Sequence, residues 1–518
     1  MTRARVHRSL LLLSLVLFVT GIPFCRPLMS FGLILISANW LAEGDFKRKW
    51  QQIKRNRILW ACLLIYIVHL AGLTYSSNLA YAWNDLVIKL PLLLLPLIFA
   101  TTRPLDNEEW RRLLAVYLFA TCTSAAIGLV HFLTHPEITD KREIAMHISY
   151  IRFELNLCFG FFVGIYLLRS RNKAKNGTPT LILTLTAILW LTAIQLYIGA
   201  LTAIALAFCC ITILLLVTAF RSKSRPLRIG VTLLLAAVTA GILLLATTTF
   251  RQYTHISATA PAATSTANGR PYASPIEKNY IENGSYVYGC LCEEELSSAW
   301  GKRSRLPYDG WTADGDHTVR NTLIRYMNSK GLTKDSLGME QLTDKDINFI
   351  ENGKASIRYT RSGLEARYFE TLWDISLYFR CNEVEGSMPR RFEMWRISRI
   401  ASTRHPLIGT GTGDVKDAVA DELVWQDSPV QGYLIRSHNQ YLSFAIAFGW
   451  IGLAIILFSL FYPPIATGKY KRGLYLAFLI IYMVSMFTDD PMERQDGVTL
   501  FAFFNSLFLF LEPDSGTQ

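Results

Sequence analysis

Apolar stretches close to twenty residues long recur along this chain, and they limit its fold more than any other feature. A helix of about twenty apolar residues is long enough to cross the hydrocarbon core of a bilayer. Of the 518 residues, 51% are hydrophobic and only 18% are charged. A soluble protein of this size carries more charge and lacks such repeated stretches. We therefore predict an all-α polytopic membrane protein.

About twelve of these stretches are predicted to be transmembrane helices, with both termini in the cytoplasm. They cover residues 10–24, 28–41, 58–74, 86–100, 113–133, 149–168, 181–197, 200–220, 229–248, 442–462, 473–487 and 498–511. The prediction places helices one to nine in residues 1–248, a mainly helical loop domain in 249–436, and helices ten to twelve in 437–518. The loop domain is long enough to fold as a small domain. Its early part, 257–274, has the composition of a linker.

The distribution of charge predicts the orientation of the chain. The whole chain has 52 basic and 40 acidic residues, whereas segment 251–436 has 23 basic and 24 acidic ones. The basic excess therefore lies in the membrane part, mostly in the short loops 43–57, 169–175, 221–228 and 469–472. Short basic loops face the cytoplasm, so the loop domain is predicted outside. A basic excess of this kind indicates membrane lipids and no nucleic-acid partner.

The cysteines and histidines predict neither a metal site nor a cofactor. Five of the nine cysteines fall in apolar runs, and Cys290, Cys292 and Cys381 fall in the loop domain. A lone Cys-X-Cys is weak evidence for zinc, and no histidine has ligand spacing. A disulfide from Cys381 to Cys290 or Cys292 is an open alternative if the compartment is oxidising.

The junction Arg436-Ser437-His438-Asn439-Gln440 is the strongest candidate site. Here the polar segment ends and an apolar run begins, which places His438 at the water–membrane boundary, in the first turn of a helix. Ser437 is the expected N-cap. His438 is interpreted either as an interfacial anchor or as a general base for a lipid-linked substrate.

Charged residues in or near the predicted spans are further candidates, because such charges are costly. Arg152, near the outer end of a span, could bind phosphate bidentately; the alternatives are a pair with Glu154 or snorkelling to the interface. Snorkelling is the preferred interpretation of Lys89. Arg390 and Arg391 begin a basic amphipathic helix that either lies on the membrane or is solvated.

The segment from Gly409 to Asp414 contains three glycines but matches neither the dinucleotide fingerprint nor the P-loop. We interpret it as a flexible loop after a helix. Its backbone N–H groups could bind an anion.

The order of these motifs resembles the O-antigen ligase family. The resemblance rests on the number of spans, the large external loop, and His438-Asn-Gln-Tyr-Leu at the start of the tenth span. Arg391-X-X-X-Trp395 and Pro406-Leu-Ile-Gly409-Thr-Gly411 resemble the segment that precedes the histidine in that family. Segments 293–300, 322–326, 329–332 and 487–497 look like the branch found in Bacteroidetes.

The resemblance implies a metal-independent glycosyltransferase without a cofactor. The donor would be a glycan on undecaprenyl diphosphate and the acceptor lipid A–core, at the periplasmic face of the bacterial inner membrane. His438 matches the essential histidine and Arg391 the arginine of the external loop, with Arg390 and Asn439 as further substrate-binding candidates.

The eighth span departs from the family pattern, because segment 195–201 has no arginine where many members have one. Arg152 is our candidate for the missing charge.

Two other functions remain open at this stage. An O-antigen or exopolysaccharide polymerase uses the same donor with a second lipid-linked glycan as acceptor. A transporter or flippase for lipid-linked sugars predicts internal repeats and charges near the middle of the bilayer. No repeat is evident, and the notable charges fall near the predicted outer face, which favours the transferases.

Overall fold

The computed structural model describes residues 3–138, 140–170, 178–199, 201–256, 264–273, 280–361, 363–430 and 436–513. They form two compact units, one of Met1–Lys223 with Met394–Gln518 and one of Ser224–Glu393. Parts of the expected linker 257–274 and of the basic loop 169–175 lie outside the described residues.

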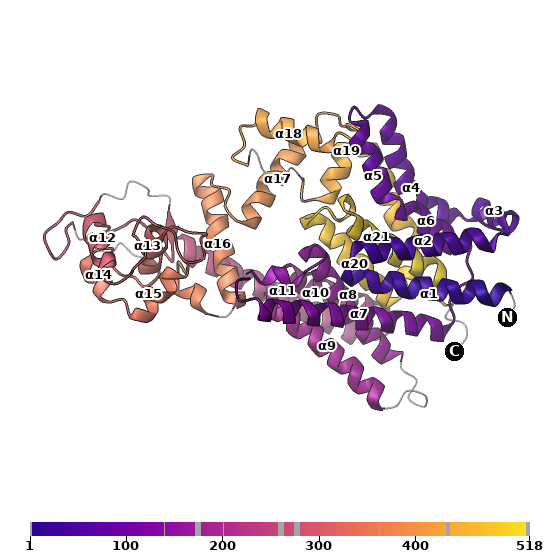
Figure 1. The fold of residues 1–518 in the computed structure, drawn as a ribbon, viewed down its shortest axis with the longest axis horizontal. Coiled ribbons are helices and arrows are strands. Elements are labelled where there is room, and N and C mark those ends of the chain that lie inside the picture. The colour runs from indigo at the N-terminus through magenta and orange to yellow at the C-terminus, as the bar shows by residue number, and fades with distance from the viewer. Residues whose placement is uncertain are drawn as a thin grey trace. The chain divides into compact units, whose positions relative to one another are not determined.

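The first unit is helical (Figure 1). Its N-terminal part contains α1 (Arg3–Phe24), α2 (Arg26–Glu43), α3 (Phe46–Arg55), α4 (Arg57–Gly72), α5 (Leu79–Lys89), α6 (Pro91–Ala100), α7 (Asn107–Thr134), α8 (Tyr150–Arg169), α9 (Thr178–Ile198) and α10 (Leu201–Arg221). Its C-terminal part contains α18 (Val415–Trp425), α19 (Gln440–Ala466), α20 (Gly473–Thr488) and α21 (Gln495–Ser506), which continues as a π-helical turn, Leu507–Leu511. Helix α17 (Ser387–Ala401) crosses the boundary between the units.

Nine helices among the described residues are long and apolar enough to cross a membrane, by length and composition. Helices Gly473–Thr488 and Gln495–Leu511 are apolar but shorter. These features support a helical multi-pass membrane protein. Each of the twelve stretches predicted from the sequence coincides with a helical segment, while the count of twelve spans and the external position of the loop domain stay predictions.

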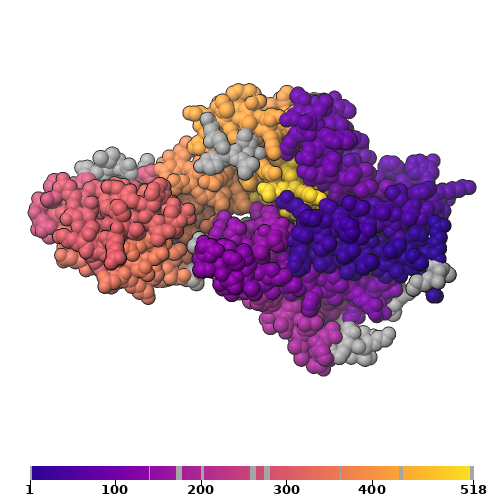
Figure 2. Space-filling view, in the orientation of Figure 1, coloured from indigo at the N-terminus to yellow at the C-terminus, as the bar shows by residue number. Residues whose placement is uncertain are grey.

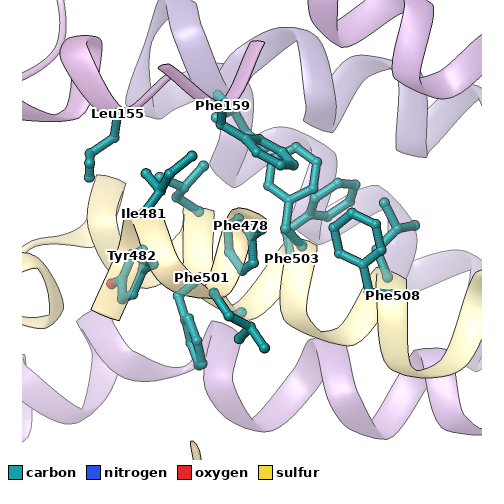
Figure 3. Packing of buried hydrophobic residues seen from close by; sticks show 14 of the residues in the cluster. Leu155, Phe159, Phe478, Ile481, Tyr482, Phe501, Phe503 and Phe508 are labelled. Carbon is teal, nitrogen blue, oxygen red and sulfur yellow. The ribbon is translucent and has the colours of Figure 1, made fainter. Parts of the chain in front are cut away.

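Aromatic side chains form much of the core of the first unit. Phe159 of α8 lies against Phe478 of α20, with ring centroids 5.2 Å apart, in a cluster that also contains Phe501 and Phe503 of α21 (Figure 3). Consistent with this burial, little of the yellow C-terminal segment reaches the surface on the face that Figure 2 shows. Most residues of α20 and α21 are buried, so polar groups on these two helices require partners inside the protein.

Helix α19 is broken at Gly449, which has φ 62° and ψ −169°. The segment that follows α17 crosses this break, backbone against backbone. The N–H groups of Trp450 and Gly411 bind the carbonyls of Pro406 and Ala447, both at 2.8 Å. The prediction of a flexible glycine loop is therefore wrong. Gly409 and Gly449 allow the two backbones to approach where a Cβ would collide, and Gly411 and Gly413 lie equally close to residues 72–78.

The second unit contains a long helix, a small hairpin and several short helices. It consists of α11 (Arg225–Thr254), antiparallel β1 (Ile281–Glu282) and β2 (Ser285–Tyr286), α12 (Glu293–Gly301), α13 (Val319–Ser329), α14 (Ser336–Glu340), α15 (Asp344–Glu351), a 3-10 turn (Ile357–Thr360) and α16 (Gly363–Cys381). Trp300, Leu323 and Ile350 are central to its core. None of the nine cysteines, all of which lie among the described residues, forms a disulfide, so the disulfides left open above are absent from this part of the chain.

Candidate active site

His438 precedes Asn439, the N-cap of α19, so it lies just outside the helix and not in its first turn as the sequence predicted. The cap of this helix is Asn439, whose Oδ1 accepts a hydrogen bond from the N–H of Leu442 at 3.1 Å. The prediction that Ser437 caps the helix is wrong; its hydroxyl donates to the Asn439 carbonyl at 2.9 Å. Both residues can cap helices, and here the chain turns at His438, which has a left-handed φ of 49°.

The backbone and side chain of His438 have separate partners. Trp395 of α17 donates its indole N–H to the His438 carbonyl at 2.9 Å, which fixes the turn. The imidazole Nδ1 is buried and lies 3.8 Å from Oδ1 of Asp489. The side chain as a whole remains 34% exposed. Nε2 has no hydrogen-bond partner among the described residues, so this is the nitrogen that can meet a substrate.

Asp489, the carboxylate near His438, belongs to an acidic turn. We define this turn as Asp489 and Asp490 together with the 3-10 turn Pro491–Glu493 that follows them. Gln440, fully buried at the start of α19, holds this turn. Its amide nitrogen donates to Glu493 at 2.9 Å, its amide oxygen accepts from the N–H of Met492 at 2.7 Å, and its backbone N–H donates to the Asp489 carbonyl at 3.2 Å. The N-terminus of α19 and the acidic turn are thus one hydrogen-bonded assembly.

Arg152 of α8 lies against the same turn. Its guanidinium forms an ion pair with Asp489 and donates to the Asp490 carbonyl at 3.4 Å. The side chain is almost fully buried. Snorkelling is therefore ruled out in this structure, and the carboxylate that Arg152 pairs with is Asp489, not the neighbouring Glu154. A buried guanidinium needs such a partner, because an unpaired charge is costly inside a protein.

Lys89 of α5 is also buried, contrary to the expected snorkelling. Its ammonium group pairs with Asp85, one helical turn earlier, and lies 3.6 Å from Glu493. Glu493 therefore connects α5 to the turn that carries Asp489. Sequence reasoning missed this pair because residues 89 and 493 are far apart in the chain. The signal that could have indicated it is the i, i+4 spacing of Asp85 and Lys89 within an apolar span.

The two aspartates of the turn differ in their acidity. Burial would raise the pKa of Asp489, but the Arg152 guanidinium outweighs burial and holds that pKa well below its usual range. Burial raises the pKa of Asp490 to about 7, and the Asp489 carboxylate adds to the rise. At neutral pH Asp489 is therefore the permanent negative charge beside His438.

Two further arginines lie at this turn. One guanidinium nitrogen of Arg436 is buried without a hydrogen-bond partner among the described residues. Burial lowers the pKa of Arg494, and the positive charges of Arg436 and Arg152 lower it further. Neither Arg436 nor Arg494 has an ion pair within the described part of the chain. Cations that repel one another in this way favour an anionic ligand.

A metal ion is a second kind of ligand to consider. One ligand atom from each of His438, Asp489 and Asp490 lies within 4.8 Å of the others. Sequence spacing predicted no metal ligands, because these residues meet only in the folded chain. The Arg152 guanidinium competes for the Asp489 carboxylate, so a divalent cation there would be close to a fixed positive charge.

The remaining predicted residues are placed as follows. Arg390, exposed, and Arg391, half-buried, lie near the start of α17 in the second unit. Their approach to His438 stays a prediction. The side chain of Asn439 uses its oxygen in the helix cap and donates its nitrogen to the Phe487 carbonyl at 3.2 Å. A substrate contact by Asn439 also stays a prediction.

The matched region of the chain contains this junction. Residues 347–457 match the O-Antigen ligase family model. The resemblance to the O-antigen ligase family is confirmed. No curated protein matches the chain. The O-antigen ligase match includes His438, Asn439, Arg390 and Arg391 and supports a glycosyltransferase of the ligase and polymerase class. The acidic turn and Arg152 lie outside the matched range.

Proposed function

We propose that the protein is an O-antigen ligase that transfers a glycan from undecaprenyl diphosphate to lipid A–core. The reaction would take place at the periplasmic face of the bacterial inner membrane. The observation that carries the proposal is the position of His438: it lies in the matched range, Nδ1 faces the Asp489 carboxylate at 3.8 Å, and Nε2 is left for a substrate.

His438 would act as the general base. Nε2 takes the proton of the acceptor hydroxyl as that oxygen attacks the anomeric carbon of the donor sugar. The bond from this carbon to the diphosphate breaks, and its electron pair leaves with the lipid diphosphate. The imidazolium formed in this step gains a favourable interaction with Asp489, whose charge is held by Arg152. In this proposal Arg152 acts through Asp489.

Arginines would bind the leaving diphosphate, because a planar guanidinium matches phosphate geometry. Arg391 precedes Trp395 by four residues on α17, which puts both on one face of that helix, and Trp395 binds the His438 carbonyl. Arg390 is its neighbour. Arg436 and Arg494, which have no ion pair among the described residues, are additional candidates and replace Arg152 as the source of the missing charge.

The proposed transfer reaction does not require a metal ion. The donor already has a good leaving group, and fixed guanidinium groups can stabilise the growing negative charge on the diphosphate. No step then requires a Lewis acid or a cofactor.

The test is transfer by purified protein supplied with a lipid-linked glycan and lipid A–core. We expect the glycan on lipid A–core; extension of the lipid-linked glycan alone would instead identify a polymerase. His438→Gln should lose transfer, because glutamine keeps a hydrogen bond but cannot accept the proton. His405→Gln, which changes an exposed histidine of the same unit, is the matched control. Near-normal turnover of His438→Gln would reject the general-base role.

A further inference from the structure

Helix α3 borders an apolar cavity at the surface of the first unit. It packs against α4 and α6 (Figure 1). The cavity has a volume of about 740 Å³, within the range of ligand pockets. Its walls are aromatic and aliphatic side chains, among them Trp40, Trp50, Trp60, Leu63, Leu93 and Leu97. Trp50 and Trp60 remain 54% and 44% exposed, so the cavity is open at one side.

The two faces of α3 have opposite character. Phe46, Trp50 and Ile53 recur at helical spacing and line the apolar cavity. Arg48, Gln51, Gln52 and Arg55 form the opposite face and line a second cavity, whose walls are partly polar. A helix of this kind lies in the plane of the membrane–water interface, with its apolar face toward the acyl chains.

The basic residues of this segment exceed the local acidic residues. Lys49 is buried and pairs with Glu43 at 2.8 Å, and Arg48 pairs with Asp45 at 2.6 Å. Four exposed cations then have no carboxylate partner within the described part of the chain: Lys47, Lys54, Arg55 and Arg57. Lys47 lines the apolar cavity, and Lys54 lies 4.9 Å above the ring of Trp50, another lining residue.

Lys47 and Lys54 are seven residues apart, so they share one edge of α3, next to the face that lines the cavity. Arg55 belongs to the opposite face and, with Arg57, lines the second cavity. One apolar cavity is therefore bordered by two ammonium groups that have no carboxylate partner among the described residues. Apolar walls suit an acyl chain, and the ammonium groups suit the phosphate that follows it in a lipid.

We propose that the α3 cavity is a binding site for an anionic phospholipid. An acyl chain occupies the cavity between Trp50, Trp60 and Leu93, and the anionic headgroup binds Lys47 and Lys54. This site is separate from the His438 assembly, and the proposal does not depend on the reaction that the protein catalyses.

The test measures phosphatidylglycerol retained by the full chain. Purified protein is equilibrated with equal amounts of phosphatidylglycerol and phosphatidylcholine in detergent, and bound lipid is counted by native mass spectrometry. We expect a resolved phosphatidylglycerol adduct. The double variant Lys47→Gln with Lys54→Gln should lower the affinity for phosphatidylglycerol about 30-fold. Arg55→Gln with Arg57→Gln is the control, since it removes the same charge from the same segment and should retain the adduct.

Equal losses in the two double variants would overturn the proposal, because they would indicate a general attraction between α3 and anionic membranes. Equal retention of the two lipids by the unaltered protein would overturn it as well. Leu93→Trp is the independent variant: it fills the cavity without changing charge, and we expect loss of the adduct. An unchanged adduct in Leu93→Trp would show that the acyl chain binds elsewhere. Unfolding temperatures of all variants identify any that fail to fold.

Discussion

Gly449→Ala tests the broken helix on which the site is built. At φ 62° and ψ −169°, Gly449 occupies a backbone region that is essentially restricted to glycine. A Cβ there would also collide with the carbonyl carbon and oxygen of Leu407. The segment that crosses α19 would have to move away, and α19 could then straighten.

The expected loss of stability has two parts. The backbone conformation costs about 1–3 kcal/mol for a residue other than glycine. Movement of the crossing segment would break the hydrogen bonds from the N–H groups of Trp450 and Ile451 to Pro406 and Leu407, at 2.8 and 3.3 Å, each worth about 0.5–1.5 kcal/mol. The free energy of unfolding should therefore fall by about 2–6 kcal/mol.

The assay is denaturant unfolding of purified protein in detergent, with Gly241→Ala as the control. Gly241 lies within α11, and a Cβ there meets nothing within 4 Å. This control should be neutral or slightly stabilising, by at most about 1 kcal/mol. If Gly449→Ala cost less than about 1 kcal/mol, the same size as the control effect, the crossing at Gly449 would be refuted.

Three further predictions concern the charged groups of the site. Lys89→Met leaves Asp85 and Glu493 without their cation and should cost about 3–5 kcal/mol of unfolding free energy. Lys89→Arg keeps the charge and should cost less. Equal stability of Lys89→Met and the unaltered protein would contradict the pairing. The pKa of Asp490 is raised from 3.8 to about 7, so its ionisation in the folded protein opposes folding, and this group lowers stability as the pH rises from about 4 to about 7. Asp490→Asn should therefore gain stability over the unaltered protein between pH 5 and pH 8, and a difference that does not change with pH would exclude this titration. Transfer activity should survive EDTA; loss with rescue by Mg²⁺ would assign a metal to His438, Asp489 and Asp490.

Local signals account for much of what the sequence predicted correctly. The apolar runs predicted helices where helices are found, because length and composition alone decide whether a segment can cross a bilayer. The change from polar to apolar residues predicted a helix start within two residues of the observed one, although His438 lies just before the helix and not in its first turn. The order of motifs around His438 led to the O-antigen ligase resemblance. Each of these inferences uses residues that are close together in the chain.

Tertiary structure decided which charges neutralise one another. Arg152 pairs with Asp489, 337 residues later in the chain, and Lys89 reaches Glu493. From sequence spacing alone, Glu154 was a possible partner of Arg152, and Lys89 was expected to reach the membrane interface. The actual partners could not be predicted, because pairing between residues far apart in the chain depends on which helices pack together. The Gly449 break is similar, since its cause, the backbone of Leu407, lies on another segment.

The junction itself shows where the limit lies. Ser437 and Asn439 are equally suitable caps by local chemistry, and the sequence could place the start of α19 only to within a turn. Gln440 settles the choice, because its backbone and side chain bind the acidic turn at Asp489, Met492 and Glu493. Local composition thus determined that a helix starts here, whereas burial of polar groups, which requires distant partners, determined where it starts and what faces His438.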